Sequence, residues 1–356
     1  MKYSPERLLI VLIILCSSHL CLAQENLDGS ALYKMIRGVI IDDITQQSIP
    51  FAHVFIKNSS TGTYTDVSGV FAIKGLQTTY ELVISHVGYM KKILLIDPSK
   101  QTNFHILLEP SKNQLEEIVI TGKKDNSREK HLKLFKDSFL GVSSFAQLCE
   151  ITNPNILHFK SDNKSLRAKT ASPLIIENMA TGYTMEYHLE SFEIDLKSNL
   201  PRYLGYSFFI EKETSNYAQK RKWRKNREKA YKGSLEHFVK SVLQDRIKKE
   251  GFRVDNKRAI SVNLDPYEKK HLIYMHDEIR VKYLREYESA AYQQGSTMSS
   301  SAEIYKTAAQ TSIIKAFDYV IKVDKNFQIL NLSRILQKGY MGWERTAESL
   351  PVEYKL

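Results

Sequence analysis

The residues best suited to do chemistry in this 356-residue sequence surround a tryptophan in its second half. The basic residues that flank Trp223 are Arg221, Lys222, Arg224, Lys225 and Arg227. Cations interleaved with aromatic side chains can bind nucleic acid, lipid headgroups or acidic glycans. The chain has a formal net charge of +11, and residues 212–258 alone hold 16 basic and 6 acidic residues. The charge therefore belongs to one region, which we interpret first as a solvated helix with Trp223 and Tyr231 packed inward. The alternative is a surface that binds an anionic envelope partner such as lipid headgroups, lipopolysaccharide phosphates or acidic glycan.

Three other groups of residues have types that could support catalysis. Glu186 and Glu190 share a face of a predicted strand, where paired carboxylates could hydrolyse a glycoside, although a solvent-facing strand is the favoured interpretation. Cys149 could be a catalytic thiol, but we expect a small buried hydrophobe. Ser161 and Lys164 fit Ser-x-x-Lys without the partner motifs of a serine acyl-enzyme.

The spacing of the histidines argues against a zinc peptidase. None of the ten His is followed three residues later by Glu, and His271 and His276 stand five apart, a poor ligand spacing. Neither Gly-x-Ser-x-Gly nor a Gly-rich phosphate loop occurs. We therefore predict no catalytic residue, no metal and no cofactor, and favour a non-enzymatic protein. The alternative is a hydrolase with an unrecognised site in the second domain, which a pocket of convergent carboxylates or His would favour.

Residues 1–23 have the pattern of a secretory signal peptide. Lys2 and Arg7 precede an apolar run from Leu8 to Leu15, and Cys21-Leu22-Ala23 offers a cleavage site. The run is too short for a membrane span. Cleavage leaves Cys149 without a disulfide partner, and export argues against a nucleic-acid ligand. We expect an exported protein, periplasmic or associated with the outer membrane of a Gram-negative bacterium, with residues 24–35 as an N-terminal segment.

Residues 36–122 show short alternating strands separated by turn signals, which predicts a β-sandwich. The strings Arg37-Gly38-Val39-Ile40, Gly62-Thr63-Tyr64-Thr65-Asp66 and Gly69-Val70-Phe71-Ala72-Ile73 are the most specific. The positions that define the pattern are Gly38, Pro50, Asp66, Gly69, Phe71, Gly88 and Tyr89. They resemble the carboxypeptidase-regulatory-like domain, which implies a transthyretin-like or immunoglobulin-like sandwich of about seven strands without catalytic activity of its own.

The segment Leu115–Gly122 resembles the connection between such domains and the plug of TonB-dependent receptors. The remaining residues are too few for the large barrel of such a receptor. The resemblance implies, as an alternative function, an accessory component of a TonB-dependent uptake system.

The rest of the chain predicts a polar linker at residues 123–136 and an α+β domain at residues 137–356, with an antiparallel sheet and a basic helix. The expected elements are a long strand at Gly182–Leu196, helices at Tyr217–Lys232 and from Ser234 to near Gly251, a strand at Ile279–Tyr287 and a hairpin at Phe317–Leu332. Strings such as Tyr203-Leu204-Gly205-Tyr206 resemble a domain of unknown function in exported bacterial proteins. We therefore expect a β-rich, α+β protein of the envelope that binds a protein partner or an anionic glycan or lipid surface.

Overall fold

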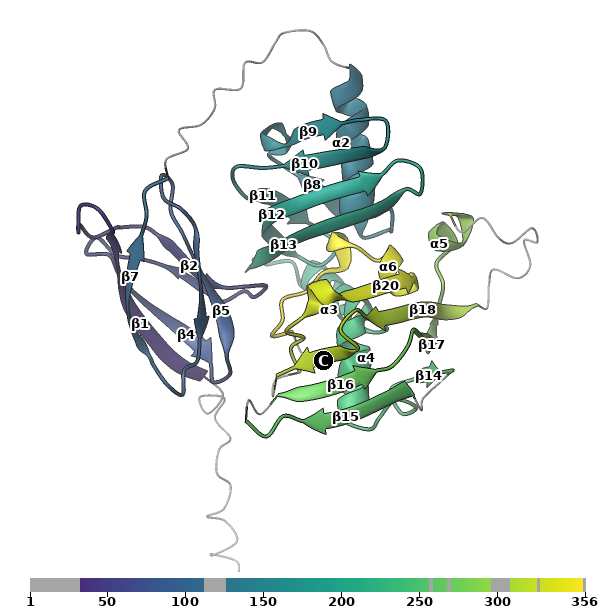
Figure 1. Ribbon diagram of the computed structural model, residues 1–356. Coiled ribbons are helices and arrows are strands. Elements are labelled where there is room, and N and C mark those ends of the chain that lie inside the picture. The colour runs from purple at the N-terminus through teal and green to yellow at the C-terminus, as the bar shows by residue number, and fades with distance from the viewer. Residues whose placement is uncertain are drawn as a thin grey trace, which may run out of the picture.

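The computed structural model describes residues 33–111, 126–255, 259–267, 270–295, 308–324 and 327–354. The predicted signal peptide and the Leu115–Gly122 segment lie outside these ranges. The described chain forms a strand-rich N-terminal unit beside a larger α+β part (Figure 1). Within these residues, no helix is long and apolar enough to cross a membrane.

The N-terminal unit is a β-sandwich, as predicted. Its strands are β1 (Tyr33–Asp42), β2 (His53–Ile56), β3 (Gly62–Tyr64), β4 (Val70–Leu76), β5 (Tyr80–Ser85), β6 (Lys92–Ile96) and β7 (Asn103–Leu108). One sheet has the order β4-β1-β7 and the other β3-β2-β5-β6. Alternate apolar side chains from both sheets, such as Ile40, Val54 and Ile84, fill the core between them.

The residues of the sequence pattern have clear physical roles in this sandwich. Asp66 Oδ1 accepts the N–H groups of Ser68 and Val70, which closes the turn before β4. Gly69 has φ +74°, and a Cβ there would lie 2.6 Å from the Ile40 carbonyl oxygen. A Cβ at Gly38 would lie 2.6 Å from the ring of the buried Phe71. Gly69 therefore permits the left-handed turn, and Gly38 leaves space for the Phe71 ring.

The first half of the larger part is a six-stranded sheet with a helix against it. Its elements are α2 (Asn126–Phe139), β8 (Cys149–Ile151), β9 (His158–Ser161), β10 (Ser165–Lys169), β11 (Leu174–Asn178), β12 (Tyr183–Asp195) and β13 (Leu200–Glu211). The long strand β12 pairs with β13 along one edge and with β11 and then β10 along the other. Tyr183, Met185, Tyr187 and Leu189 share its buried face, as predicted.

The predicted linker at residues 123–136 is wrong from Asn126 onward, because that segment is most of helix α2. Phe135 and Phe139 of α2 are fully buried in the core of the sheet. The polar composition concealed an amphipathic helix whose few apolar residues all face the sheet.

The second half contains helices α3 (Tyr217–Tyr231) and α4 (Leu235–Leu243) and two further antiparallel sheets. One sheet has the order β14-β17-β18-β20, formed by Phe252–Val254, Ile279–Tyr287, Ala309–Ala316 and Ile335–Gly339. The other has the order β15-β16-β19, formed by Ile260–Leu264, His271–Met275 and Val320–Val323. Short helices α5 (Ala290–Gly295) and α6 (Tyr340–Trp343) flank these sheets (Figure 1).

The predicted hairpin Phe317–Leu332 is confirmed around its turn, where Val323 forms an antiparallel bridge with Ile329 and Leu330 donates its N–H to the Lys322 carbonyl oxygen at 2.9 Å. Its first arm, β19, also pairs with β16, which the sequence did not indicate. The second helix ends at Leu243 rather than near Gly251, because the chain turns through Asp245, whose φ is +50°. Strand Ile279–Tyr287 and the N-cap at Ser234 are as predicted.

The sandwich contacts the larger part through the turn between β2 and β3. Phe209 donates its N–H to the carbonyl oxygen of Ser59 at 2.9 Å, and Val352 donates its N–H to the carbonyl oxygen of Asn58 at 2.9 Å. Phe55 and Val83 of the sandwich form an apolar cluster with Tyr206 and Phe208 of β13. Both backbone hydrogen bonds and apolar burial therefore hold the two parts together.

Candidate functional site

The basic segment is helix α3, whose ends are fixed by local hydrogen bonds. The Asn216 side chain accepts the N–H groups of Ala218 (3.0 Å) and Gln219 (3.2 Å), which satisfies donors that a helix N-terminus leaves free. At the other end Gly233 takes φ +84°, and Ser234 caps α4 by accepting the His237 N–H. Both ends of the helix are thus defined by local hydrogen bonds and turn geometry.

Trp223 and Arg227 lie on the inner face of α3 and hold it against the β11–β12 turn. Trp223 is 5% exposed and donates its indole N–H to the carbonyl oxygen of Met179 at 3.0 Å. Arg227 donates from Nε to the carbonyl oxygen of Thr181 at 2.6 Å and lies over the Tyr183 ring at 4.0 Å. These two predicted binding residues are therefore engaged inside the fold, and Tyr231 is buried as well.

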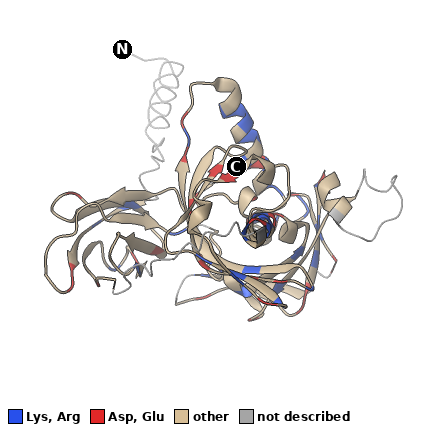
Figure 2. Ribbon diagram, turned by 90° about the horizontal axis from the view of Figure 1, so that it is seen from above, with Lys and Arg blue, Asp and Glu red and all other residues tan. Residues whose placement is uncertain are grey.

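The other four predicted residues, Arg221, Lys222, Arg224 and Lys225, are exposed, as is the preceding Lys220. We call these five residues the basic face. Residues three and four apart lie on the same side of a helix, so Lys222 and Lys225 continue to Lys229, while Arg221 and Arg224 form a parallel row. Figure 2 colours the Lys and Arg positions blue. The basic face is a band of exposed cations that covers about half of the circumference of α3.

Of the other catalytic candidates, the Glu186 and Glu190 pair can be set aside. Glu186 is half-buried against the sandwich, 3.6 Å from His53 Nδ1, whereas Glu190 is exposed beside a bulge between Leu189 and Ser191. Neither lines the cavity described below. The structure therefore gives the paired-carboxylate hypothesis no support, because Glu186 is held beside His53 and Glu190 is exposed at the bulge.

The remaining candidates do not form a reactive group. Burial raises the pKa of the Cys149 thiol to about 12, opposite to the direction that activates a nucleophile. Ser161 and Lys164 are exposed near the turn between β9 and β10. Within the described ranges, no three His, Cys, Asp or Glu side chains are grouped so that they could hold a metal ion.

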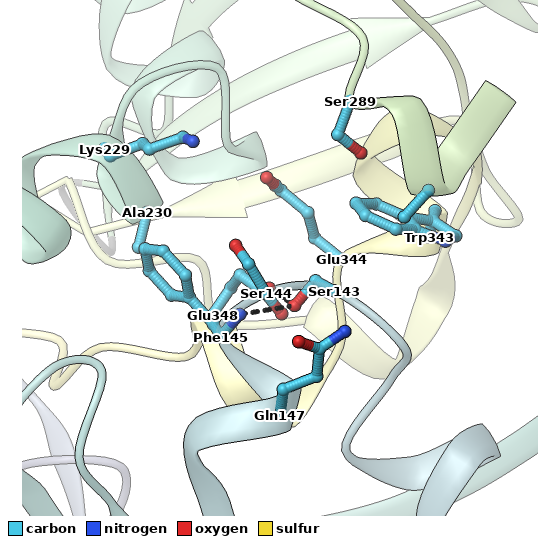
Figure 3. A pocket seen from close by; sticks show the side chains of 11 residues that line it. Ser143, Ser144, Phe145, Gln147, Lys229, Ala230, Ser289, Trp343, Glu344 and Glu348 are labelled. Atoms are coloured by element: carbon cyan, nitrogen blue, oxygen red, sulfur yellow. Dashed lines mark hydrogen bonds between the residues drawn. The ribbon is translucent and has the colours of Figure 1, made fainter.

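Sequence reasoning missed a cavity of about 230 Å³ between α3, the segment around Ser143 and the C-terminal segment. Figure 3 shows Glu344 and Glu348 in this cavity, with Lys229 and Ser289 on opposite sides of Glu344. Trp343 and Phe145 supply aromatic walls. The residues come from segments up to 205 positions apart, so no local spacing could have indicated the cavity.

The two cavity carboxylates differ in their partners. Glu348 accepts a hydrogen bond from the Ser143 hydroxyl and another from the Arg345 N–H at 3.1 Å. Burial raises the pKa of Glu344 well above its ordinary value, and the negative charges of Glu348 and Glu286 raise it further. Lys229 acts in the opposite direction. Burial raises the pKa of Glu348 as well, but its hydrogen bonds act in the opposite direction, so the charge of Glu344 is the less compensated of the two.

Comparison with known proteins identifies the class of the N-terminal unit. Residues 36–120 match the family model of the CarboxypepD_reg-like domain. This part of the chain is therefore a carboxypeptidase-regulatory-like domain, as the sequence predicted. No curated protein matches the chain.

Solved structures give only distant similarities. A DUF3823 family protein from Bacteroides ovatus is 12% identical over 51% of this chain and 82% of that one, with a TM-score of 0.19. A 9R-lipoxygenase from Cyanothece is 12% identical over 62% of this chain and 49% of that one, with a TM-score of 0.18. A protein of unknown function from Bacteroides fragilis is 10% identical over 71% of this chain and 90% of that one, with a TM-score of 0.19. At these TM-scores, the similarities carry no functional assignment.

Proposed function

We propose that this protein is a non-enzymatic binding protein of the bacterial cell envelope that attaches to an anionic surface through the basic face of α3. The carboxypeptidase-regulatory-like sandwich is its scaffold. The observation that carries the proposal is that α3 has two different sides. Trp223 and Arg227 attach the helix to the fold, and the five cations of the basic face remain exposed to solvent.

The electrostatics of such a face suit a surface that carries many phosphate or carboxylate groups. A Lys or Arg near an anionic membrane contributes about 1 kcal/mol, so several cations on one rigid helix add up to useful affinity. Attraction of this kind weakens as salt screens it, with a screening length of about 8 Å at physiological ionic strength. The predicted export of the chain favours lipid headgroups or acidic glycans over nucleic acid as the ligand.

Charge reversal on the basic face tests this proposal. Arg224→Glu combined with Lys225→Glu should leave the thermal unfolding unchanged and weaken binding to vesicles that contain phosphatidylglycerol. The matched control is Lys248→Glu with Lys249→Glu, because these two lysines are adjacent, exposed and outside α3. Both double variants change the net charge equally, so the control separates a local site from overall charge.

The expected result is loss of vesicle binding in the α3 variant and retention in the control, with the wild-type affinity falling as salt rises. Soluble heparin in a parallel titration distinguishes a glycan from a lipid source of the anionic groups. Equal binding by both variants, or binding that salt does not affect, would contradict the proposal.

The cavity favours one second candidate, a hydrolase, because Ser143 and Glu348 form a hydroxyl–carboxylate contact there. The Ser143 Oγ also accepts the N–H groups of Phe145 (3.2 Å) and Ala146 (3.1 Å). A hydroxyl with three hydrogen-bond partners has a structural role, which makes this candidate the weaker one. Hydrolysis of p-nitrophenyl esters or glycosides that Ser143→Ala and Glu348→Gln abolish would establish it.

A further inference from the structure

The cavity beneath the C-terminal end of α3 has a chemistry opposite to that of the basic face. Its two carboxylates, Glu344 and Glu348, project from the C-terminal segment, and Trp343 closes one side (Figure 3). Phe145 lies on another side, and Ser289 lines the rim, where its hydroxyl accepts the Tyr292 N–H at 3.3 Å. The site therefore combines negative charge, aromatic faces and hydroxyl groups in a space of about 230 Å³.

The charges around Glu344 are unbalanced. Glu348, Glu286 and Glu236 add negative charge to its surroundings, whereas Glu286 itself accepts a 3.4 Å hydrogen bond from Gln310 Nε2 and is influenced by the cations Lys229 and Lys232. Lys229 is the cation that faces Glu344 in Figure 3, and it reaches in from an exposed position at the rim. A second positive charge inside the cavity would complete the balance.

We propose that this cavity binds the primary ammonium group of a small organic cation, with the nitrogen held by the Glu344 carboxylate against the Trp343 ring. An ammonium group has three donors for carboxylate and hydroxyl oxygens, and its charge is attracted to aromatic faces. A metal ion fits less well, because the described residues supply no group of three His, Cys, Asp or Glu ligands. An anion would meet two carboxylates.

Burial supports this assignment through proton linkage. The raised pKa of Glu344 means that the empty cavity holds a proton there at a pH where an exposed carboxyl has lost it. A bound ammonium group would displace this proton, so the affinity should rise with pH by up to about tenfold per unit while the carboxyl titrates. A neutral ligand would show no such dependence.

Matched pairs of probes test the proposal on the whole protein. Glucosamine and glucose differ at one amino group, and ethanolamine and ethylene glycol form a second pair of smaller size. We expect calorimetry to detect at least one of the two amines and neither of the neutral partners, with proton release that appears as a dependence on the ionisation enthalpy of the buffer. Equal binding of an amine and its neutral partner, or no binding of either amine, would overturn the proposal.

Variants at the two charged positions should move the affinity in opposite directions. Glu344→Gln keeps the shape and should weaken amine binding by about 10- to 100-fold and abolish proton release. Lys229→Met removes the competing cation and should strengthen binding. The control Glu129→Gln changes an exposed carboxylate on α2 and should have no effect. Weaker binding in Lys229→Met would contradict the proposal, and thermal unfolding of each variant verifies that it folds.

This inference goes beyond the proposed function and does not rest on it. The double variant Arg224→Glu and Lys225→Glu changes the basic face only, so it should leave amine binding in the cavity intact. Amine binding that disappears together with vesicle binding in this variant would contradict a separate site.

Discussion

Asn58 and Ser207 exchange hydrogen bonds across the boundary between the sandwich and the larger part. Asn58 donates its N–H to the Ser207 carbonyl oxygen at 2.8 Å, and Ser207 donates its N–H to Asn58 Oδ1 at 2.9 Å. Asn58 has φ +59°, a left-handed conformation that Asn tolerates better than most residues. One side chain thus sets both the turn and its attachment to β13.

Substitution of Asn58 should separate these two roles. Asn58→Gly keeps the left-handed turn and removes the acceptor for Ser207, so we expect a loss of about 1 to 2 kcal/mol in the free energy of unfolding. Asn58→Ala adds the strain of φ +59° and should cost about 1 kcal/mol more. Urea denaturation measures both, and equal stability of Asn58→Gly and wild type would show that the contact contributes nothing.

Acidification should destabilise the protein through His53 and His188, which are buried where the sandwich meets β12 and β13. Burial lowers the pKa of each to about 4, and for His188 the charge of Lys91 contributes to this shift. Between pH 6.5 and 4 the unfolded chain therefore binds more protons, so stability is full above pH 6.5 and falls by up to about 1.4 kcal/mol per pH unit for each group. Burial raises the pKa of Glu186, which gives a smaller effect of opposite sign.

The variant His188→Phe tests this assignment. The ring of His188 stacks on Tyr206 with centroids 4.8 Å apart, and its Nε2 has no hydrogen-bond partner among the described residues. Phe keeps the stacking and cannot be protonated, so the melting temperature should fall less between about pH 7 and pH 5 than in wild type. His158→Phe at an exposed position is the control. An unchanged pH profile in His188→Phe would contradict the prediction.

Gly182 leaves room for the Trp223 ring, and its substitution should disturb the packing of α3 against the β11–β12 turn. It has φ +73°, and a Cβ there would lie 2.2 Å from Trp223 Cδ2. Gly182→Ala should therefore destabilise the protein by about 2 kcal/mol or more. Gly88→Ala is the matched control, since Gly88 has φ +88° but no atom lies within 4 Å of the position that a Cβ would take there. Similar losses for the two variants, measured by denaturation, would contradict the close packing of Trp223.

Cys149 should react slowly in the folded protein. Burial raises the pKa of its thiol to about 12, so almost no thiolate is present at neutral pH. Alkylation by iodoacetamide near neutral pH should be slow without denaturant and fast in urea, as mass spectrometry can follow. Rapid alkylation of the native protein would show a reactive thiol instead.

The sequence indicated the sandwich well because its signals are local. Asp66 and Gly69 form one turn, and Phe71 follows within two residues, so short spacing carries the structural information. Strand β12 was equally clear, since apolar and polar residues alternate along much of its thirteen-residue length. Helix α2 and strand β18 were missed, because a polar segment and a weak alternation gain their stability from distant partners.

The same distinction between local sequence signals and long-range contacts applies to the candidate sites. The sequence by itself determined that a basic segment is helical and that its charge is concentrated there, because composition and helical spacing are local properties. Only the tertiary structure decided that Trp223 and Arg227 turn inward, and that Glu344, Glu348 and Lys229 meet at one cavity. Burial and long-range contact depend on how segments up to 205 residues apart pack together, which no spacing along the chain records.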